Sequence, residues 1–70
     1  MDGRVAIAEA SAILGVSLPA SEAHTVGGMV ISHLRHLPAV DEYVIQSGYR
    51  FSVELVSERG IRTIRAERTG

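Results

Sequence analysis

Two histidines followed by two acidic residues form the part of this sequence best suited to binding a metal ion. His33 and His36 are three residues apart, a spacing that places both imidazoles on one face of a helix. Imidazole nitrogens are common ligands of transition metals, and Asp41 and Glu42 lie near enough along the chain to add carboxylate oxygens. The simpler interpretation, which we favour, is that His36 interacts with the negative end of the helix dipole and that both histidines are surface residues.

Magnesium prefers oxygen ligands, so a magnesium site would draw on acidic residues rather than on the histidines. The acidic candidates are Asp41, Glu42, Glu54 and Glu58. Their spacing along the chain does not define a cage. A divalent cation is therefore a candidate cofactor without a defined set of ligands.

The segment Thr25-Val26-Gly27-Gly28 is a second place with potential chemistry, because backbone N–H groups at the start of a helix can bind an anion. Gly27 and Gly28 lack the longer glycine pattern of a dinucleotide-binding turn. Thr25 stands where a helix N-cap is expected, just before the apolar periodicity begins. We favour a structural interpretation, in which Thr25 caps the helix and the glycines allow close approach of another backbone, over cofactor binding by this segment.

Arginines recur at every third position near the end of the chain, at residues 59, 62, 65 and 68. On a strand this spacing alternates between the two faces, so the arginines do not form one phosphate-binding stripe. Cross-strand pairing with Glu54 and Glu58 explains them more simply. Seven basic against eight acidic residues give a net charge of −1, and few aromatic residues are present to stack on bases. We therefore expect no nucleic-acid partner.

No combination of residues in the sequence is typical of an enzyme active site. There is no cysteine nucleophile, and Ser32 lacks the flanking glycines of a nucleophile elbow. His24 stands beside Thr25 and is expected to belong to the helix cap rather than to act as a general base. We predict no enzymatic activity.

Seventy residues, 46% of them hydrophobic, suffice for one domain with a small core. Such a core rarely supplies more than about 3–5 kcal/mol, and no disulfide can add to it, so we expect support from oligomerisation or from a larger protein. No apolar run is long enough to cross a bilayer, and the N-terminus lacks the features of a signal peptide. We therefore expect no direct membrane insertion, and Met1 is interpreted as the start of an excised domain.

The hydrophobic periodicity predicts an α+β fold of two helices packed on a small antiparallel sheet, in the order β-α-α-β-β-β. A short extended piece is expected at Val5. The predicted helices cover residues 6–14 and 26–36, and the predicted strands cover residues 43–46, 49–56 and 61–67. Gly15 and Pro38 should end the two helices, and Ser47-Gly48 should form a short hairpin turn.

The spacing of apolar residues predicts which side of each element is buried. In the second helix the buried stripe comprises Val26, Met29, Val30, Leu34 and Leu37. In the strand at residues 49–56, alternation places Leu55 on the same buried side as Phe51 and Val53. Ile61 and Ile64 cannot share one side of a regular strand, so either a bulge follows the turn at Gly60 or Ile61 belongs to that turn.

The order of these motifs resembles one known family over nearly the whole chain. The matching features are Asp2-Gly3, Leu14-Gly15, Leu18-Pro19, Thr25 with Gly28, Pro38, Tyr49, Phe51 with Val53, and Ile61 with Ile64. The chain is similar to the CorC/HlyC transporter-associated domain of hemolysin-related magnesium and cobalt efflux proteins. One departure is Asp41, which stands in a turn where the family commonly has glycine, and glycine accepts left-handed geometry more readily.

The resemblance implies a non-catalytic accessory domain that modulates ion transport from the cytoplasmic side of the membrane. Its expected partners are the CBS and membrane domains of a parent protein and a second copy of the domain in a homodimer, with edge strands available for dimer contacts. The fold is similar to part of the FAD-binding domain of the vanillyl-alcohol-oxidase type, so FAD is a candidate by analogy. The alternative function is a small ligand-binding module for FAD, a nucleotide or a divalent metal.

Overall fold

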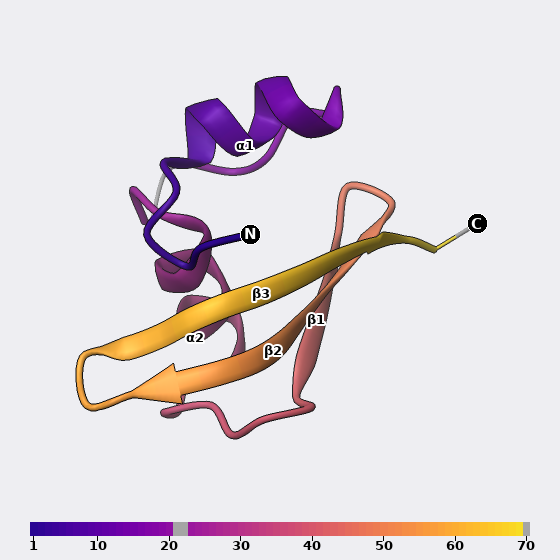
Figure 1. The fold of residues 1–70 in the computed structure, drawn as a ribbon. Coiled ribbons are helices and arrows are strands. Elements are labelled where there is room, and N and C mark those ends of the chain that lie inside the picture. The colour runs from indigo at the N-terminus through magenta and orange to yellow at the C-terminus, as the bar shows by residue number, and fades with distance from the viewer. Residues whose placement is uncertain (21–22, 70) are drawn as a thin grey trace.

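Two helices pack against a three-stranded antiparallel sheet of order β1-β2-β3 (Figure 1). The computed structural model describes residues 1–20 and 23–69. Its elements are α1 (Ile7–Leu14), α2 (Val26–Leu34), β1 (Tyr43–Gln46), β2 (Tyr49–Ser57) and β3 (Gly60–Arg68). The predicted α+β fold is confirmed. The expected first strand is reduced to two isolated bridges, one between Asp2 and Thr63 and one between Ala6 and Thr25.

Helix α1 ends where the sequence predicts, because Gly15 takes the left-handed conformation (φ 70°) that closes a helix. Its backbone N–H donates to the carbonyl of Ser11 over 2.9 Å. Ile7 and Ala10 are buried against the rest of the core. The loop that follows places Leu18 in the core as well.

Helix α2 begins as predicted and ends earlier than predicted. Thr25 is its N-cap, and the Thr25 hydroxyl accepts the N–H of Gly28 over 3.0 Å. The last helical residue is Leu34, and Arg35 is left-handed (φ 61°). His36 therefore lies outside the helix, and Leu37 is 76% exposed instead of buried. The residue before a proline disfavours helical geometry, which is consistent with this early end ahead of Pro38.

The β1-β2 hairpin is closed by a two-residue turn in which Ser47 (φ 54°) and Gly48 (φ 80°) both have positive φ. This is the type I′ geometry, whose twist matches that of the flanking strands. The pairing runs from Gln46 opposite Tyr49 to Tyr43 opposite Ser52. The sequence therefore identified both the strand and its turn.

Asp41 adopts the left-handed conformation (φ 78°), which a glycine would take without strain. Its N–H donates to the carbonyl of Val53 over 2.9 Å, so the turn is part of the sheet. We expect Asp41→Gly to leave stability unchanged or to raise it by about 0.5 kcal/mol, and the β-branched Asp41→Val to lower it by about 1–2 kcal/mol. Urea unfolding followed by circular dichroism measures both. A loss of stability in the glycine variant would show that the aspartate side chain itself stabilises the turn.

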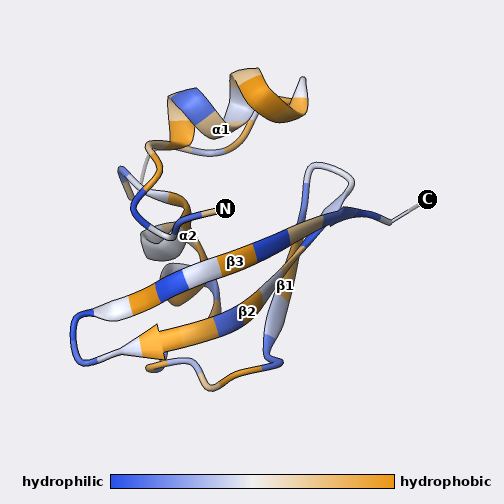
Figure 2. Cartoon of the chain, viewed as in Figure 1, coloured by the Kyte–Doolittle hydropathy of each residue, from blue (hydrophilic) through white to orange (hydrophobic). Residues whose placement is uncertain are grey.

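The β2-β3 ladder contains two register shifts, one on either side of Leu55. They allow Ile61 and Ile64 to be buried together although they are three residues apart, so of the two predicted alternatives the bulge is the one found. The same irregularity makes the prediction for Leu55 wrong, since its side chain is 52% exposed. Figure 2 shows polar and apolar residues alternating along β3.

The core lies between the helices and one face of the sheet. Its largest fully buried side chains are Phe51, Ile7, Met29, Ile64, Val26, Val30 and Val53. The opposite face of the sheet is largely exposed and carries Tyr43 and Ile45 beside its charged residues. Ser52 is buried there, since it is small and lies between Tyr43 and Arg65 on the neighbouring strands. One small core therefore supports both helices and the sheet.

Candidate functional site

The first turn of α2 has its backbone donors paired within the chain. The N–H groups of Val26, Gly27 and Gly28 donate to the Val5 carbonyl (3.0 Å), the Gly3 carbonyl (2.8 Å) and the Thr25 hydroxyl (3.0 Å). An anion bound at a helix start needs such N–H groups to be free. These residues therefore do not fit the pyrophosphate of a flavin dinucleotide, and their visible role is to join α2 to the N-terminal segment.

Gly27 is needed there because of space rather than because of a ligand. A Cβ atom at this position would lie 2.7 Å from the carbonyl oxygen of Gly3. The close backbone approach predicted for the glycine pair is thus made by Gly27. At Gly28 a Cβ atom would meet the side chains of Thr25 and Ala23 at 3.2 and 3.3 Å.

The two candidate histidines have separate partners. The Nδ1–H of His33 donates to the carbonyl of Met29, four residues back on α2, over 2.9 Å. The Nε2–H of His36 donates to Oε1 of Glu42 over 2.7 Å. Because α2 ends at Leu34, the two imidazoles do not share one helical face.

Glu42 is the centre of a small polar cluster in the loop between α2 and β1. Its other carboxylate oxygen accepts the N–H of Ala39 over 2.7 Å. The Ala39 N–H, followed by the hydrogen bond from His36, lowers the pKa of Glu42 below its ordinary value, and Glu42 raises the pKa of His36. The cluster therefore holds the loop most firmly when Glu42 is ionised and His36 is protonated.

The stability of the protein should depend on pH because both groups of this cluster have shifted pKa values. The contribution of His36 is complete below its ordinary pKa of 6.5 and is lost as the pH rises through its raised folded-state pKa. The contribution of Glu42 is complete above 4.5 and is lost as the pH falls through its lowered pKa. We expect wild type to exceed His36→Gln in unfolding free energy at pH 5.5 and the difference to shrink at pH 8.5. Urea unfolding at both pH values tests this, and a difference independent of pH would contradict it.

Within residues 1–20 and 23–69, no three or more histidine, aspartate or glutamate side chains are arranged to hold a metal ion. His33, His36 and Glu42 are engaged in the hydrogen bonds above. Asp41 is exposed next to Glu42. The structure thus brings His36 and Glu42 together and leaves His33 apart from them, while metal binding by this set stays a prediction.

The arginines near the C-terminus do not simply alternate between two faces, because Arg59 lies in the β2-β3 turn and lines the same pocket as Arg62. Arg65 lies 3.0 Å from Glu67 and 3.8 Å from Glu54, and Arg50 lies 3.6 Å from Glu67. The predicted pairing with Glu54 is therefore found. Glu67, rather than Glu58, is the other acidic partner.

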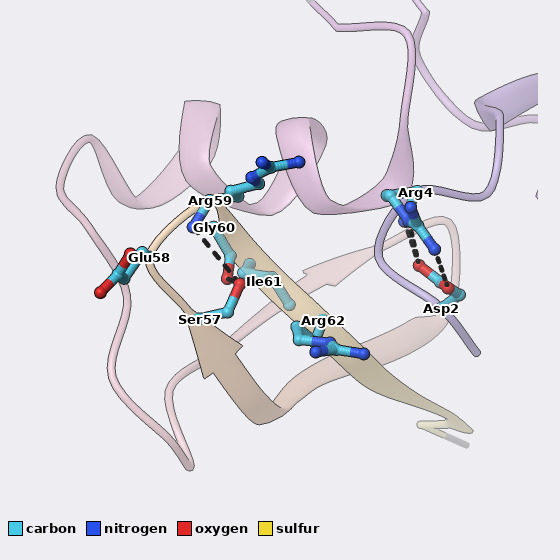
Figure 3. A pocket seen from close by; sticks show the side chains of 8 residues that line it. All are labelled: Asp2, Arg4, Ser57, Glu58, Arg59, Gly60, Ile61 and Arg62. Atoms are coloured by element: carbon cyan, nitrogen blue, oxygen red, sulfur yellow. Dashed lines mark hydrogen bonds and ion pairs between the residues drawn. The ribbon is translucent and has the colours of Figure 1, made fainter.

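A groove of about 480 Å³ lies where the β2-β3 turn meets the N-terminal segment (Figure 3). Its lining residues are Asp2, Arg4, Ser57, Glu58, Arg59, Gly60, Ile61 and Arg62. Asp2 and Arg4 pair with each other at 3.4 Å, and Glu58 points away from them. The side chains of Arg59 and Arg62 form no ion pair with any other side chain that the structure describes.

Guanidinium groups suit a carboxylate or a phosphate better than a metal cation. The groove is therefore suited to an acidic group of a partner. The N–H and side chain of Arg4 hold the carboxylate of Asp2 and lower its pKa. Sequence reasoning missed Arg4 and Ser57 because the N-terminal segment joins the turn only in the folded chain. The feature of the sequence that pointed to this groove was the repeated arginines, two of which, Arg59 and Arg62, line it.

The fold and these contacts can be compared with known proteins. The family model of the transporter associated domain CorC_HlyC matches residues 1–70. The chain belongs to the CorC_HlyC family. No match is found among curated proteins.

Solved CorC_HlyC domains share this fold closely. The domain from Nitrosomonas europaea is 30% identical with a TM-score of 0.92, covering 99% of this chain and 84% of that one. A Mg²⁺ and Co²⁺ transporter (CorC) associated region from Neisseria meningitidis MC58 is 32% identical with a TM-score of 0.91, covering 99% and 85%. The CorC_HlyC domain of a Xylella fastidiosa Temecula1 hemolysin, in complex with Mg²⁺ and Mn²⁺, is 28% identical with a TM-score of 0.88, covering 100% and 85%.

The CorC_HlyC domain described here has no helix, within its described residues, that is long and apolar enough to cross a membrane. Asp41, which stands where the resemblance led us to expect glycine, is accommodated in the left-handed conformation. The departure from the family pattern therefore leaves the fold intact.

Proposed function

We propose that this domain is a non-catalytic regulatory module of a CorC-type or hemolysin-like protein that exports divalent cations. In this proposal it lies on the cytoplasmic side of the membrane, beside the CBS and membrane-spanning domains of its parent protein. The observation that carries the proposal is the match of the CorC_HlyC family to residues 1–70. The similarity to a region associated with a Mg²⁺ and Co²⁺ transporter adds support.

The groove at the β2-β3 turn offers a physical route for regulation. It presents Arg59 and Arg62 to an acidic group, and arginine forks bind carboxylates with defined geometry. Contact with an acidic segment of the parent protein would couple the position of this domain to the state of the transporter. Such coupling requires that the contact differ between two transporter states.

Reading the coding sequence around residue 1 is the first test, because the proposal requires membrane spans and CBS domains in the same protein. The second test is the flux of Mg²⁺ and Co²⁺ from vesicles that contain the full parent protein, compared with a version lacking residues 1–70. We expect removal to change the rate by about 5-fold or more, a typical size for regulatory coupling. The control is Leu55→Ala in the full parent protein, a substitution of an exposed side chain that should leave the flux unchanged. Equal flux with and without the domain would refute a regulatory role.

A second candidate function is direct binding of a divalent cation, which the Mg²⁺ and Mn²⁺ complex of the Xylella fastidiosa domain favours. We propose Asp41 and Glu42 as the oxygen donors, since Asp41 is exposed beside the Glu42 carboxylate. Mn²⁺ should then broaden the amide resonances of residues 39–43, and Asp41→Asn should reduce the effect. Glu9→Gln, which changes an exposed carboxylate on α1, is the control. An unchanged melting temperature at millimolar Mg²⁺ and Mn²⁺, together with no selective broadening, would end this alternative.

A further inference from the structure

The two edges of the sheet differ in how they are covered. Beyond β3, the N-terminal segment adds its own backbone: the N–H of Gly3 donates to the Arg62 carbonyl (2.9 Å), and the N–H of Ile64 donates to the Met1 carbonyl (2.7 Å). β1 is the last strand on the other side (Figure 1). Among residues 1–20 and 23–69, no segment pairs with its outer edge.

β1 is short, with four residues, but it lacks the other features that protect an edge strand from pairing. Its sequence, Tyr-Val-Ile-Gln, contains no charge and no proline, and the register shifts of the sheet lie between β2 and β3. Tyr43 and Ile45 are 51% and 58% exposed. An uncharged edge with exposed apolar side chains is a template for another strand.

The turn determines which backbone groups point outward. A two-residue turn is flanked by a hydrogen-bonded pair, here Gln46 with Tyr49, and such pairs alternate with non-hydrogen-bonded ones. Val44 and Gln46 therefore bond to β2, while Tyr43 and Ile45 direct their N–H and C=O groups away from the sheet. Each β1 edge offers two donors and two acceptors at this spacing.

We propose that a second copy of this chain adds to β1 in antiparallel pairing, about a two-fold axis at Val44, to form a continuous six-stranded sheet. This proposal does not depend on the proposed function. In this register Tyr43 lies opposite the partner's Ile45, and Ile45 lies opposite the partner's Tyr43, so all the outward backbone groups are paired. Aromatic and β-branched residues are favourable cross-strand neighbours.

The charges beside β1 favour a second copy as the occupant. In the joined sheet, residues that face one another form rows across the six strands. The row through Ile45 would contain Glu67, Arg50 and Ile45 of one chain, followed by the partner's Tyr43, Ser52 and Arg65. Arg50 and the partner's Arg65 would be about 19 Å apart at four strand spacings, well beyond the screening length of about 8 Å. Arg50 is already paired with Glu67 at 3.6 Å and stacks over the Tyr43 ring at 5.5 Å. No like charges meet in these rows, and the four residues of β1 carry no charge with which to select an acidic or basic peptide.

Cysteine cross-linking tests the register, because the chain contains no cysteine of its own. Val44→Cys would face the partner's copy in a non-hydrogen-bonded pair with Cα atoms about 4.5 Å apart, within the range that a disulfide spans. We expect oxidised Val44→Cys to run as a covalent dimer on a non-reducing gel. Ile45→Cys is the control. In the proposed pairing Ile45 faces the partner's Tyr43, so the two introduced cysteines would be two residues apart along the strands and should cross-link much less. Cross-linking that is equal in both variants, or stronger in Ile45→Cys, would overturn the proposed register.

Sedimentation equilibrium tests the association without altering a buried residue. The mass of the wild-type domain should rise from 7.5 kDa towards twice that value with increasing concentration. Ile45→Lys places a charge on the edge and should keep the mass at that of one chain. Leu55→Lys, equally exposed but on the central strand, should still associate. A wild-type domain that stays a monomer up to its solubility limit would refute the proposal. Equal loss of association in both lysine variants, with circular dichroism showing that both are folded, would also refute it.

Discussion

Replacing Gly27 with alanine should lower the free energy of unfolding by about 2 kcal/mol, whereas the same replacement at Gly28 should change it by less than about 0.5 kcal/mol. Both glycines lie in the first turn of α2. Both gain up to about 1 kcal/mol of helix propensity on replacement by alanine. The difference between them must therefore come from their surroundings.

At Gly27 the added Cβ atom would lie 2.7 Å from a backbone oxygen, that of Gly3. The backbone of Gly3 cannot move away freely, because its own N–H is bonded to β3 at Arg62. The new methyl group therefore strains the bond between the Gly27 N–H and the Gly3 carbonyl, which is 2.8 Å long in the native protein. At Gly28 the nearest atoms are side-chain atoms of Thr25 and Ala23 at 3.2 and 3.3 Å, which can shift by a few tenths of an ångström.

Urea unfolding and thermal unfolding, both monitored by circular dichroism, measure the free energy and the melting temperature of the two variants under identical conditions. A small domain of this kind has about 3–5 kcal/mol of stability, so a loss of about 2 kcal/mol should appear as a drop of roughly 10 °C in melting temperature. Equal losses at Gly27 and Gly28 would show that the approach of the N-terminal segment to α2 is not what makes Gly27 necessary. The decisive result is whether Gly27→Ala is less stable than Gly28→Ala.

Phe51→Ala should cost about 3–5 kcal/mol, enough to unfold most of the protein, while Leu55→Ala should cost less than about 0.5 kcal/mol. Strict alternation along β2 would place the two side chains on the same buried face. In the structure Phe51 is fully buried, and Leu55 is 52% exposed. The bulge between them is the physical reason for the difference.

The melting temperatures of the two variants test the bulge directly. Phe51→Leu removes fewer atoms and serves as the measurable substitute if Phe51→Ala is unfolded at all temperatures. We expect the order of stability to be Leu55→Ala, then Phe51→Leu, then Phe51→Ala. A loss at Leu55 comparable to that at Phe51 would mean that β2 continues without a bulge and that Leu55 belongs to the core.

The features that were predictable from sequence depend on contacts between near neighbours. The cap at Thr25 reaches three residues along the chain, and the turn at Ser47-Gly48 is closed by the adjoining strands. The left-handed Gly15 likewise ends α1 through a bond to Ser11. Spacing in the sequence is a direct measure of such contacts, so the order of the two helices and the last three strands, and most of their boundaries, were correctly predicted, whereas the expected first strand was not found.

The parts that the sequence did not predict depend on distant segments. Met1 contacts Ile64, 63 residues away, and this pairing places Asp2 and Arg4 beside the β2-β3 turn. The end of α2 before His36 was also missed, because periodicity continues past Leu34 while the His36 imidazole is instead bonded to Glu42. Periodicity does not register a side-chain bond that spans a loop.

The sequence by itself determined the order of the two helices and the three strands that follow them, the α2 cap, the hairpin turn and the resemblance to the CorC_HlyC family. Only the tertiary structure decided that the α2 start is closed by Gly3, that His33 and His36 have separate partners, and that β1 is the one uncovered edge among the described strands. The reason is physical. Local hydrogen bonding and periodicity act over a few residues, whereas the closing of a helix start, the covering of a sheet edge and the lining of a groove depend on segments that meet only when the whole chain has folded.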